Sequence, residues 1–317
     1  MKAQFLCILI IVGCLSCTTI KQSSTGFADS YQEVSTLLSK RTAKADYFFK
    51  QGPINVKTIK DLKLPLSHEY SLEIDLYLPE QEQSAPLLIF QHGNRSSKKY
   101  HSYQANLAAS WGFLALTVQQ PNRGEWLENG KRLKRLTELL KVWPSLLKNK
   151  YDPEKIILVG HSFGGSAIAI ASGSGAPVAG LIFLDPALVH NSVKDKLSSI
   201  KIPAIILGAD ESVFKSRRRQ FFFKNYNGPM TEISISGATH NDAQFPNMFE
   251  WKQAIGLSPT PKEKYQEQFA AAIIAAAFSL AEGGSGYYFK SAIERSKKIS
   301  LKKIRSKNET TRKISQN

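Results

Sequence analysis

The residues most able to do chemistry begin with a serine placed between two glycines. Residues 160–165 read GHSFGG and directly follow the apolar run IILV. A Gly-x-Ser-x-Gly turn between a buried strand and a helix holds the serine hydroxyl clear of the sheet, where it can attack a substrate. Glycines remove the side chains that would collide as strand and helix close on each other. We therefore expect Ser162 to be a nucleophile on a strained turn. The alternative is a serine that only caps the helix.

A serine hydroxyl needs an adjacent base to act as a nucleophile at neutral pH. In chains with this turn, the order along the sequence is serine, acid and histidine. Of the six histidines, only His190 and His240 follow the turn. His240 comes just after the last apolar strand-like run, whereas His190 lies five residues after Asp185 and suits a surface or capping role. We therefore predict that His240 is the base.

The acid that would orient this histidine has three candidates. Asp185 ends the run GLIFLDP, and Asp210 and Glu211 end the next run, IILGADES. Parallel strands place their carboxyl ends at one edge of the sheet, so each of these carboxylates is expected near the serine turn. A carboxylate that is not the acid is expected to cap a helix, which suits Asp210. The spacing alone leaves the three open.

Apolar segments of strand length alternate along the chain with segments of helical length. The predicted strands are 70–78, 85–93, 111–121, 154–160, 179–186, 202–210 and 231–237. The predicted helices are 99–110, 130–148, 163–172, 212–224 and 262–281. This alternation predicts an α/β fold with a mostly parallel central sheet and helices on both faces. The apolar part of the last helix is short for a membrane span, so we expect that helix to pack on the sheet.

Several motifs in this order resemble those of the α/β-hydrolase superfamily. They are LLIFQHGN, WGFLALTVQQP, GHSFGG, GLIFLDPAL, IKIPAIILGADES and ISGATHNDAQF, and they extend over about residues 70–250. Within the superfamily, they are most similar to the branch of the plasma-type platelet-activating-factor acetylhydrolases, the chlorophyllases and the polyester hydrolases. The resemblance implies an α/β-hydrolase fold and a serine carboxylic-ester hydrolase. Such an enzyme uses neither a metal nor an organic cofactor and acts on a small-molecule or lipid ester.

The resemblance also implies roles for individual residues. The branch takes its acid from the Asp of an Leu-Asp pair, which matches Asp185, whereas other α/β-hydrolases use the next strand end, where Asp210 and Glu211 stand. Backbone N–H groups at Phe163 and Asn94 would form the oxyanion hole. The alternative function is a catalytically inactive, hydrolase-like binding protein of the cell envelope, because a fold does not determine an activity.

The first residues of the chain have the layout of an export signal. In residues 1–17, Lys2 precedes an apolar segment that ends in small residues before a cysteine. This pattern is typical of a secretory signal peptide and resembles a bacterial lipobox, with lipidation at Cys14 or Cys17. Residues 18–30 are small and polar, as in a tether. We expect an exported protein anchored to the envelope; the alternatives are a plain secretory signal or an N-terminal membrane anchor.

The remaining chain is expected to form one domain, 31–285, and a basic tail, 286–317. The domain contains no cysteine, which excludes a disulfide or a thiolate nucleophile within it. The formal charge is +16, and the segment from Lys290 to Asn317 holds ten Lys and Arg against two Glu. We interpret the tail as solvated and disordered, with an anionic membrane or envelope surface as its alternative partner. Nucleic acid is not expected for an exported chain.

Overall fold

The structure is a computed structural model that describes most of the chain. The described residues are 44–81, 84–121, 123–147, 150–211, 217–246, 261–283 and 287–308. The predicted signal peptide, Cys14, Cys17 and the tether lie outside these residues. Of the helices that are described, none combines the length and apolarity needed to cross a bilayer.

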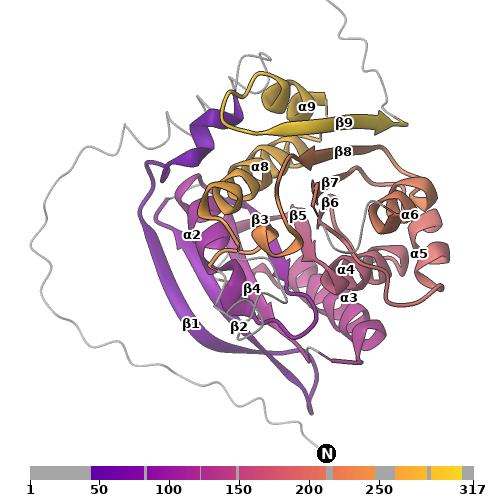
Figure 1. The fold of residues 1–317 in the computed structure, drawn as a ribbon. Coiled ribbons are helices and arrows are strands. Elements are labelled where there is room, and N and C mark those ends of the chain that lie inside the picture. Colours follow the sequence, from indigo (N-terminus) through magenta and orange to yellow (C-terminus); the bar gives the residue numbers. More distant parts are fainter. Residues whose placement is uncertain are drawn as a thin grey trace, which may run out of the picture.

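A nine-stranded sheet forms the centre of the molecule, in the order β1-β2-β4-β3-β5-β6-β7-β8-β9 (Figure 1). Its strands are β1 (Val56–Pro65), β2 (Ser71–Pro79), β3 (Ala85–Gln91), β4 (Leu114–Gln119), β5 (Tyr151–His161), β6 (Gly180–Leu184), β7 (Ala204–Ala209), β8 (Met230–Ile235) and β9 (Leu301–Lys307). Strands β3 to β8 run parallel, and antiparallel strands flank them at both edges. The predicted strands are confirmed, each with its bounds shifted by a few residues.

Alternate residues of the parallel strands face two separate apolar layers. In β5, Ile157 and Val159 belong to one core, and Ile156 and Leu158 belong to the other. This is the two-residue period of a strand that is buried on both faces, and it explains why the central strands are continuous apolar runs.

Helices cover both faces of the sheet (Figure 1). One layer holds η1 (Ala45–Phe49), α2 (Ser102–Ser110), α8 (Glu263–Ala281) and α9 (Tyr287–Glu294). The other holds α3 (Trp126–Val142), α4 (Phe163–Gly173), α5 (Val193–Ser199) and α6 (Arg217–Asn225). Short 3-10 turns, η2 (Lys98–His101), η3 (Pro144–Leu147) and η4 (His240–Ala243), lie in the connections. This arrangement confirms the predicted α/β fold, with a mostly parallel central sheet and helices on both faces.

Helix α8 packs on the sheet, as its apolar composition predicts. Every residue from Gln268 to Ala281 is buried, and the helix contacts β5, β6 and β7. Each of its fully buried large side chains, such as Phe269 and Phe278, contributes about 1.5–3 kcal/mol to folding through removal of apolar surface from water.

Strand β1 is absent from the sequence prediction because its apolar alternation is interrupted. Its register against β2 shifts between Ile59 and Leu62, and Asp61 in this bulge has a φ of 55°. A bulge inserts an extra residue, so the apolar residues on its two sides fall out of the two-residue period.

The predicted end of the domain at residue 285 is too early. Residues 287–294 form α9, and residues 301–307 form β9, which pairs with β8 in an antiparallel ladder from Leu301 to Lys307. The expectation of a disordered tail is therefore wrong for residues 287–308. Composition misled the prediction because an edge strand needs few apolar residues, and charged residues are common on such strands.

Candidate active site

Ser162 occupies the turn between β5 and α4. Its backbone φ is 54° and its ψ is −121°, a conformation that costs a residue with a Cβ on the order of 1–3 kcal/mol. The N–H of Ser162 donates to the carbonyl of Leu184 at 3.1 Å, and the N–H of Ala187 donates to the carbonyl of Ser162 at 2.9 Å. These bonds fasten the strained turn to β6 and to the segment that follows it.

The glycines around Ser162 are required by close approach. A Cβ at Gly160 would lie 2.5 Å from the carbonyl oxygen of Gly164, and a Cβ at Gly164 would lie 2.5 Å from that of Gln91. The prediction that these glycines let strand and helix close on each other is therefore confirmed. The loop after β3 is equally close, because a Cβ at Gly93 would lie 2.8 Å from the Cβ of Ser162.

Asp185 and His240 lie in contact at the same edge of the sheet. Asp185 follows β6 and His240 begins η4, the turn after β8. The Nδ1 atom of His240 lies 2.6 Å from Oδ2 of Asp185. An ionised carboxylate only accepts hydrogen bonds, so Nδ1 carries the proton and the lone pair of the neutral ring is on Nε2. An imidazole in this tautomer can take a proton through Nε2.

The carboxylate of Asp185 is held through its other oxygen as well. The N–H of Ala209 donates to Oδ1 at 3.2 Å, and Nε of Arg219 lies 3.3 Å from the same oxygen. The backbone of Asp185 has a φ of 37° and its N–H donates to the carbonyl of Leu207 at 2.8 Å. The side chain is therefore fixed between β7, α6 and the histidine, and it is 3% exposed.

The turn that carries His240 is closed by a capping box. Asp242 accepts from the N–H of Thr239 at 2.6 Å and from its hydroxyl at 2.8 Å, and its second oxygen accepts from the N–H of Lys262 at 2.6 Å. Burial raises the pKa of the Asp242 carboxyl, and these hydrogen bonds oppose the rise. Asp242 thus ties the end of β8 to the start of α8 and sets the position from which His240 projects.

His161, the residue before the serine, supports His240 from the other side. Its Nε2 lies 3.1 Å from the carbonyl oxygen of His240, so this nitrogen donates, and the two rings are 4.6 Å apart between centroids. Burial, and secondly the neighbouring His240, hold the pKa of His161 well below 6.5. The ring is therefore neutral at neutral pH and serves as a hydrogen-bond donor.

The other candidate acids, Asp210 and Glu211, also lie at the carboxyl ends of the strands, but they do not contact His240 in the same way as Asp185. Asp210 pairs with Lys302 of β9 at 2.9 Å, and Glu211 is exposed, with its backbone N–H on the carbonyl of Ala238. His190 is also exposed and accepts from the N–H of Ser192 at 3.2 Å just before α5, which is the surface role expected for it. The structure therefore brings Asp185 to His240 and turns Asp210 toward the edge strand.

The backbone groups expected to form an oxyanion hole flank the serine. Phe163 is the first residue of α4, so its N–H belongs to the helix N-terminus, where such groups lack an intrahelical partner and favour negative charge. Asn94 is exposed on the loop after β3, one residue beyond the close contact of Gly93 with Ser162. The two residues belong to two different connections, both of which reach the serine.

His92 is buried and holds that loop in place. Its Nδ1 donates to the carbonyl of Gly93 at 2.9 Å, and its Nε2 lies 3.1 Å from the carbonyl oxygen and 3.2 Å from the backbone nitrogen of Gln120. Burial lowers the pKa of the His92 ring. His92 thus joins the ends of β3 and β4.

The side chains of Trp126, Phe222 and Phe223 serve as packing. Trp126 is 5% exposed, and its ring lies 5.5 Å from that of Phe163. Phe222 is fully buried against Phe183 in the core, and Phe223 lies under the guanidinium of Arg305, 3.9 Å from its ring centre.

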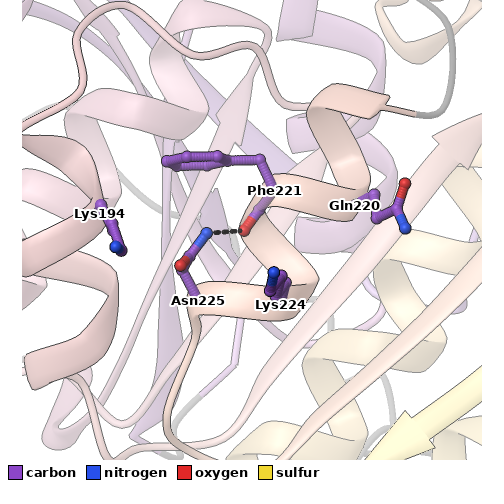
Figure 2. A pocket seen from close by; sticks show the side chains of 5 residues that line it. All are labelled: Lys194, Gln220, Phe221, Lys224 and Asn225. Carbon is purple, nitrogen blue, oxygen red and sulfur yellow. Dashed lines mark hydrogen bonds between the residues drawn. The ribbon is translucent and has the colours of Figure 1, made fainter.

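Phe221 lines a cavity of about 440 Å³ between α5 and α6, apart from the serine (Figure 2). The lining residues are Lys194, Gln220, Phe221, Lys224 and Asn225. A second cavity, of about 270 Å³, reaches the neighbourhood of Asp185 through Arg219. It is lined by Asp210, Arg219, Gln220, Glu232, Ser234, Lys302, Lys303 and Arg305.

His161 and Arg219 are the site residues that sequence reasoning missed. His161 stands inside the quoted GHSFGG motif, where attention falls on the serine and glycines. Arg219 belongs to a run of three arginines that is typical of a solvated helix face. The available signal was Glu232, a carboxylate inside the predicted strand 231–237, because a buried charge requires a partner.

Among the residues that the structure describes, no group of three or more His, Cys, Asp or Glu is placed to hold a metal ion.

Comparison with known proteins identifies the family of this chain. The model of a family described as "Alpha/beta hydrolase family" matches residues 87–283, which include the serine turn, Asp185 and His240. A search of curated proteins found no match to the chain.

Proposed function

Because this chain belongs to the alpha/beta hydrolase family, we propose that it is a serine carboxylic-ester hydrolase. In this proposal Ser162 is the nucleophile, His240 is the base and Asp185 is the acid. The single observation that carries it is the 2.6 Å contact between His240 Nδ1 and Asp185, at the sheet edge where Ser162 sits on its strained turn. Asp210 and Glu211 are set aside as acids because their contacts lie with Lys302 and the backbone of Ala238.

The first half of the reaction acylates the enzyme. The hydroxyl oxygen of Ser162 attacks the ester carbonyl carbon while Nε2 of His240 takes the hydroxyl proton. The backbone N–H groups of Phe163 and Asn94 stabilise the negative oxygen of the tetrahedral intermediate. The C–O bond to the alcohol then breaks, and the alcohol leaves with the proton from His240. Asp185 stabilises the imidazolium and keeps Nδ1 protonated throughout.

The second half releases the acyl group to water. A water molecule gives a proton to His240 Nε2 and attacks the acyl carbon, and Ser162 takes that proton back as the carboxylic acid departs. No metal or organic cofactor enters this scheme. We further propose, from the motifs it shares with the acetylhydrolase, chlorophyllase and polyester hydrolase branch, that the substrate is a small-molecule or lipid ester.

We also propose that the enzyme acts at the cell envelope. The export-signal pattern of residues 1–17 supports this place of action, with lipid attached at Cys14 or Cys17. The exposed residues Arg295, Lys297 and Lys298, just before β9, offer positive charge to an anionic surface. Metabolic labelling with a fatty-acid analogue tests this: it should label the wild type and fail in one of the variants Cys14→Ala and Cys17→Ala. Labelling of both variants, or of none of the three proteins, contradicts the anchor.

The test of the reaction combines a covalent probe with a substrate series. A fluorophosphonate should add to the protein once, on the peptide that contains Ser162, and Ser162→Ala should remain unlabelled. Hydrolysis of p-nitrophenyl esters of increasing acyl length should fall by about 10⁴-fold or more in Ser162→Ala. A folded wild type with neither adduct nor hydrolysis would overturn the proposal and leave the inactive envelope binding protein in its place.

A further inference from the structure

A buried arginine lies behind the carboxylate that contacts His240. Arg219, on α6, is 5% exposed, and its Nε lies 3.3 Å from Oδ1 of Asp185. Its NH1 donates to the hydroxyl of Ser234 at 3.2 Å and lies 4.0 Å from Oε1 of Glu232. The guanidinium therefore lies between two carboxylates that come from different parts of the sheet.

The backbone of β7 leaves room for this side chain. Gly208 is the residue that Arg219 crosses, and a Cβ at that position would lie 1.6 Å from the NH1 atom. No side chain is compatible with that distance, so the path of the arginine toward Asp185 depends on a glycine near the C-terminal end of a buried strand. Glycine weakens a strand interior and marks a close approach of this kind.

Glu232 is held by the C-terminal strand. It is 4% exposed, and its Oε2 accepts from Nε of Arg305 at 2.6 Å, with a second contact from the same guanidinium. Arg305 lies on β9, and its planar group also covers the ring of Phe223 on α6. Arg305 therefore already neutralises Glu232. The charge of Glu232 does not explain why a second cation, Arg219, is buried beside it.

The charges alternate in sign from the edge of the sheet to the proposed base. Arg305 from β9, Glu232 from β8, Arg219 from α6 and Asp185 after β6 form a chain that ends at His240. Lys302, Lys303 and Asp210 line the cavity beside it, and His161 faces His240 from β5. We call Arg305, Glu232, Arg219 and Asp185 together the acid-supporting chain.

We propose that Arg219 is a positioning residue for the proposed hydrolase, and that it acts through Asp185. The N–H of Ala209 donates to Oδ1, and the guanidinium of Arg219 forms an ion pair with the same oxygen, 3.3 Å from Nε, although Nε makes no hydrogen bond within the described residues. This charge attraction favours the rotation of the carboxylate that presents Oδ2 to His240. Its positive charge also offsets part of the negative charge that Asp185 places beside the imidazole. This inference rests on the proposed function and adds a residue to it.

The two effects give distinct consequences for Arg219→Gln. Loss of positioning should lower kcat by about 10- to 100-fold with little change in KM, because a small misplacement of the acting groups has effects of this size. Loss of the cation leaves Asp185 uncompensated, which favours the protonated imidazole. The acidic limb of the kcat/KM profile should therefore move to higher pH, by roughly half a unit to one unit.

Lys303→Gln is the matched control, because it removes one positive charge from the same cavity at an exposed position. It should leave kcat and the acidic limb unchanged. Arg219→Lys keeps the positive charge but not the planar guanidinium. The acidic limb of its kcat/KM profile should therefore lie close to that of the wild type, whereas its kcat should stay below the wild-type value. If Arg219→Gln fails to fold, Arg219→Lys and the rescue of Arg219→Ala by millimolar guanidinium, measured against sodium chloride, give the same answer.

A measurement in the free protein separates this inference from the proposed reaction. The proton between His240 and Asp185 should give a downfield NMR resonance that is absent from His240→Gln and displaced in Arg219→Gln, with Lys303→Gln like the wild type. An inactive wild type that shows this displacement would contradict the esterase and keep the Arg219 coupling. A wild-type resonance and a wild-type pH profile in folded Arg219→Gln would overturn the inference.

Discussion

Two buried cations in this molecule are surrounded by carboxylates, and only one of them stands beside the proposed site. Lys98, at the start of η2, lies 2.6 Å from Asp61, 3.0 Å from Glu73 and 2.6 Å from Asp75. Arg219 lies between Asp185 and Glu232.

The difference between them is in what the carboxylates touch next. Burial opposes the charge of Lys98, but its hydrogen bonds to three carboxylates outweigh this effect and raise its pKa. Its partners lie on β1 and β2, so it clamps one side of the sheet. The partner of Arg219 continues to a histidine. We therefore expect the Arg219 pair to affect the proposed chemistry and the Lys98 cluster to affect stability alone.

The largest expected effect separates two aspartates of equal burial. Asp185→Asn should lower kcat/KM by about 10³- to 10⁴-fold, because the amide no longer stabilises the tautomer and the imidazolium of the base. Asp75→Asn should lower the free energy of unfolding and leave kcat of the folded enzyme within a few-fold. Ester hydrolysis and urea unfolding of both variants check this.

Asp210→Asn and Glu211→Gln are the controls for that assignment, and each should retain kcat/KM within about threefold. A loss of several orders in one of them, with Asp185→Asn near the wild type, would contradict the choice of acid.

The second effect concerns the stability contributed by Lys98 and the three carboxylates around it. Lys98→Met leaves the nearly buried Asp75 without its cation, and breaking a buried pair in this way costs about 3–5 kcal/mol. The free energy of unfolding should fall by that amount, and the acidic limb of the kcat/KM profile should not move. Urea unfolding and the pH profile measure the two. A shift of the acidic limb would mean that Lys98 also influences the protonation of His240, which would contradict the expected difference between Lys98 and Arg219.

The third effect is a loss of stability in acid that comes from buried histidines. Burial lowers the pKa of His101 from 6.5 to about 4 and holds that of His161 well below 6.5. The folded state therefore binds fewer protons than the unfolded state between these values, so stability is present above pH 6.5 and is lost as the pH falls toward 4. For His101 alone the loss at pH 5 is about 2 kcal/mol.

Urea unfolding at pH 7 and pH 5 tests this term. His101→Phe, which cannot take up a proton, should lose less stability between the two pH values than the wild type. The variant His190→Gln, at an exposed position, is the control. Equal losses in the wild type and in His101→Phe would show that other groups cause the acid sensitivity.

The smallest effect is expected at the far end of the acid-supporting chain. Arg305→Gln removes the partner of Glu232, two charges away from Asp185, and should lower kcat about two- to fivefold. It also removes the contact over Phe223, which contributes about 0.5–1 kcal/mol to stability. A fall in kcat as large as that of Arg219→Gln would place the control of Asp185 in Glu232 and Arg305 instead.

The sequence predicted the central sheet well because burial on both faces makes those strands continuous apolar runs. It failed at the edges, where one face meets water: β1 is interrupted at Asp61, and β9 is mostly basic. Helix α5 also escaped notice, since its seven residues are too few to show a helical period.

For the candidate site, the sequence predicted the features that depend on residues close together in the chain. Gly160, Ser162 and Gly164 lie within five residues and form a recognisable local motif, although Gly164 also meets the backbone of Gln91. The choice among Asp185, Asp210 and Glu211 depended on which strand end faces His240, and spacing leaves that open. The contacts of Arg219 depend on a glycine in β7, on the carboxylate that follows β6 and on Glu232 in β8, and only Glu232 gave a signal of them in the sequence.

The amino-acid sequence by itself determined the strand-and-helix alternation, the strained serine turn and the set of residues from which an acid and a base could come. Tertiary structure alone decided that Asp185 meets His240, that Asp210 pairs with Lys302, and that the basic C-terminal segment becomes a ninth strand. The physical reason is the distance along the chain between the groups that interact. Steric and apolar patterns act between neighbours in the chain, whereas charge pairing acts between groups that only the folded sheet brings together.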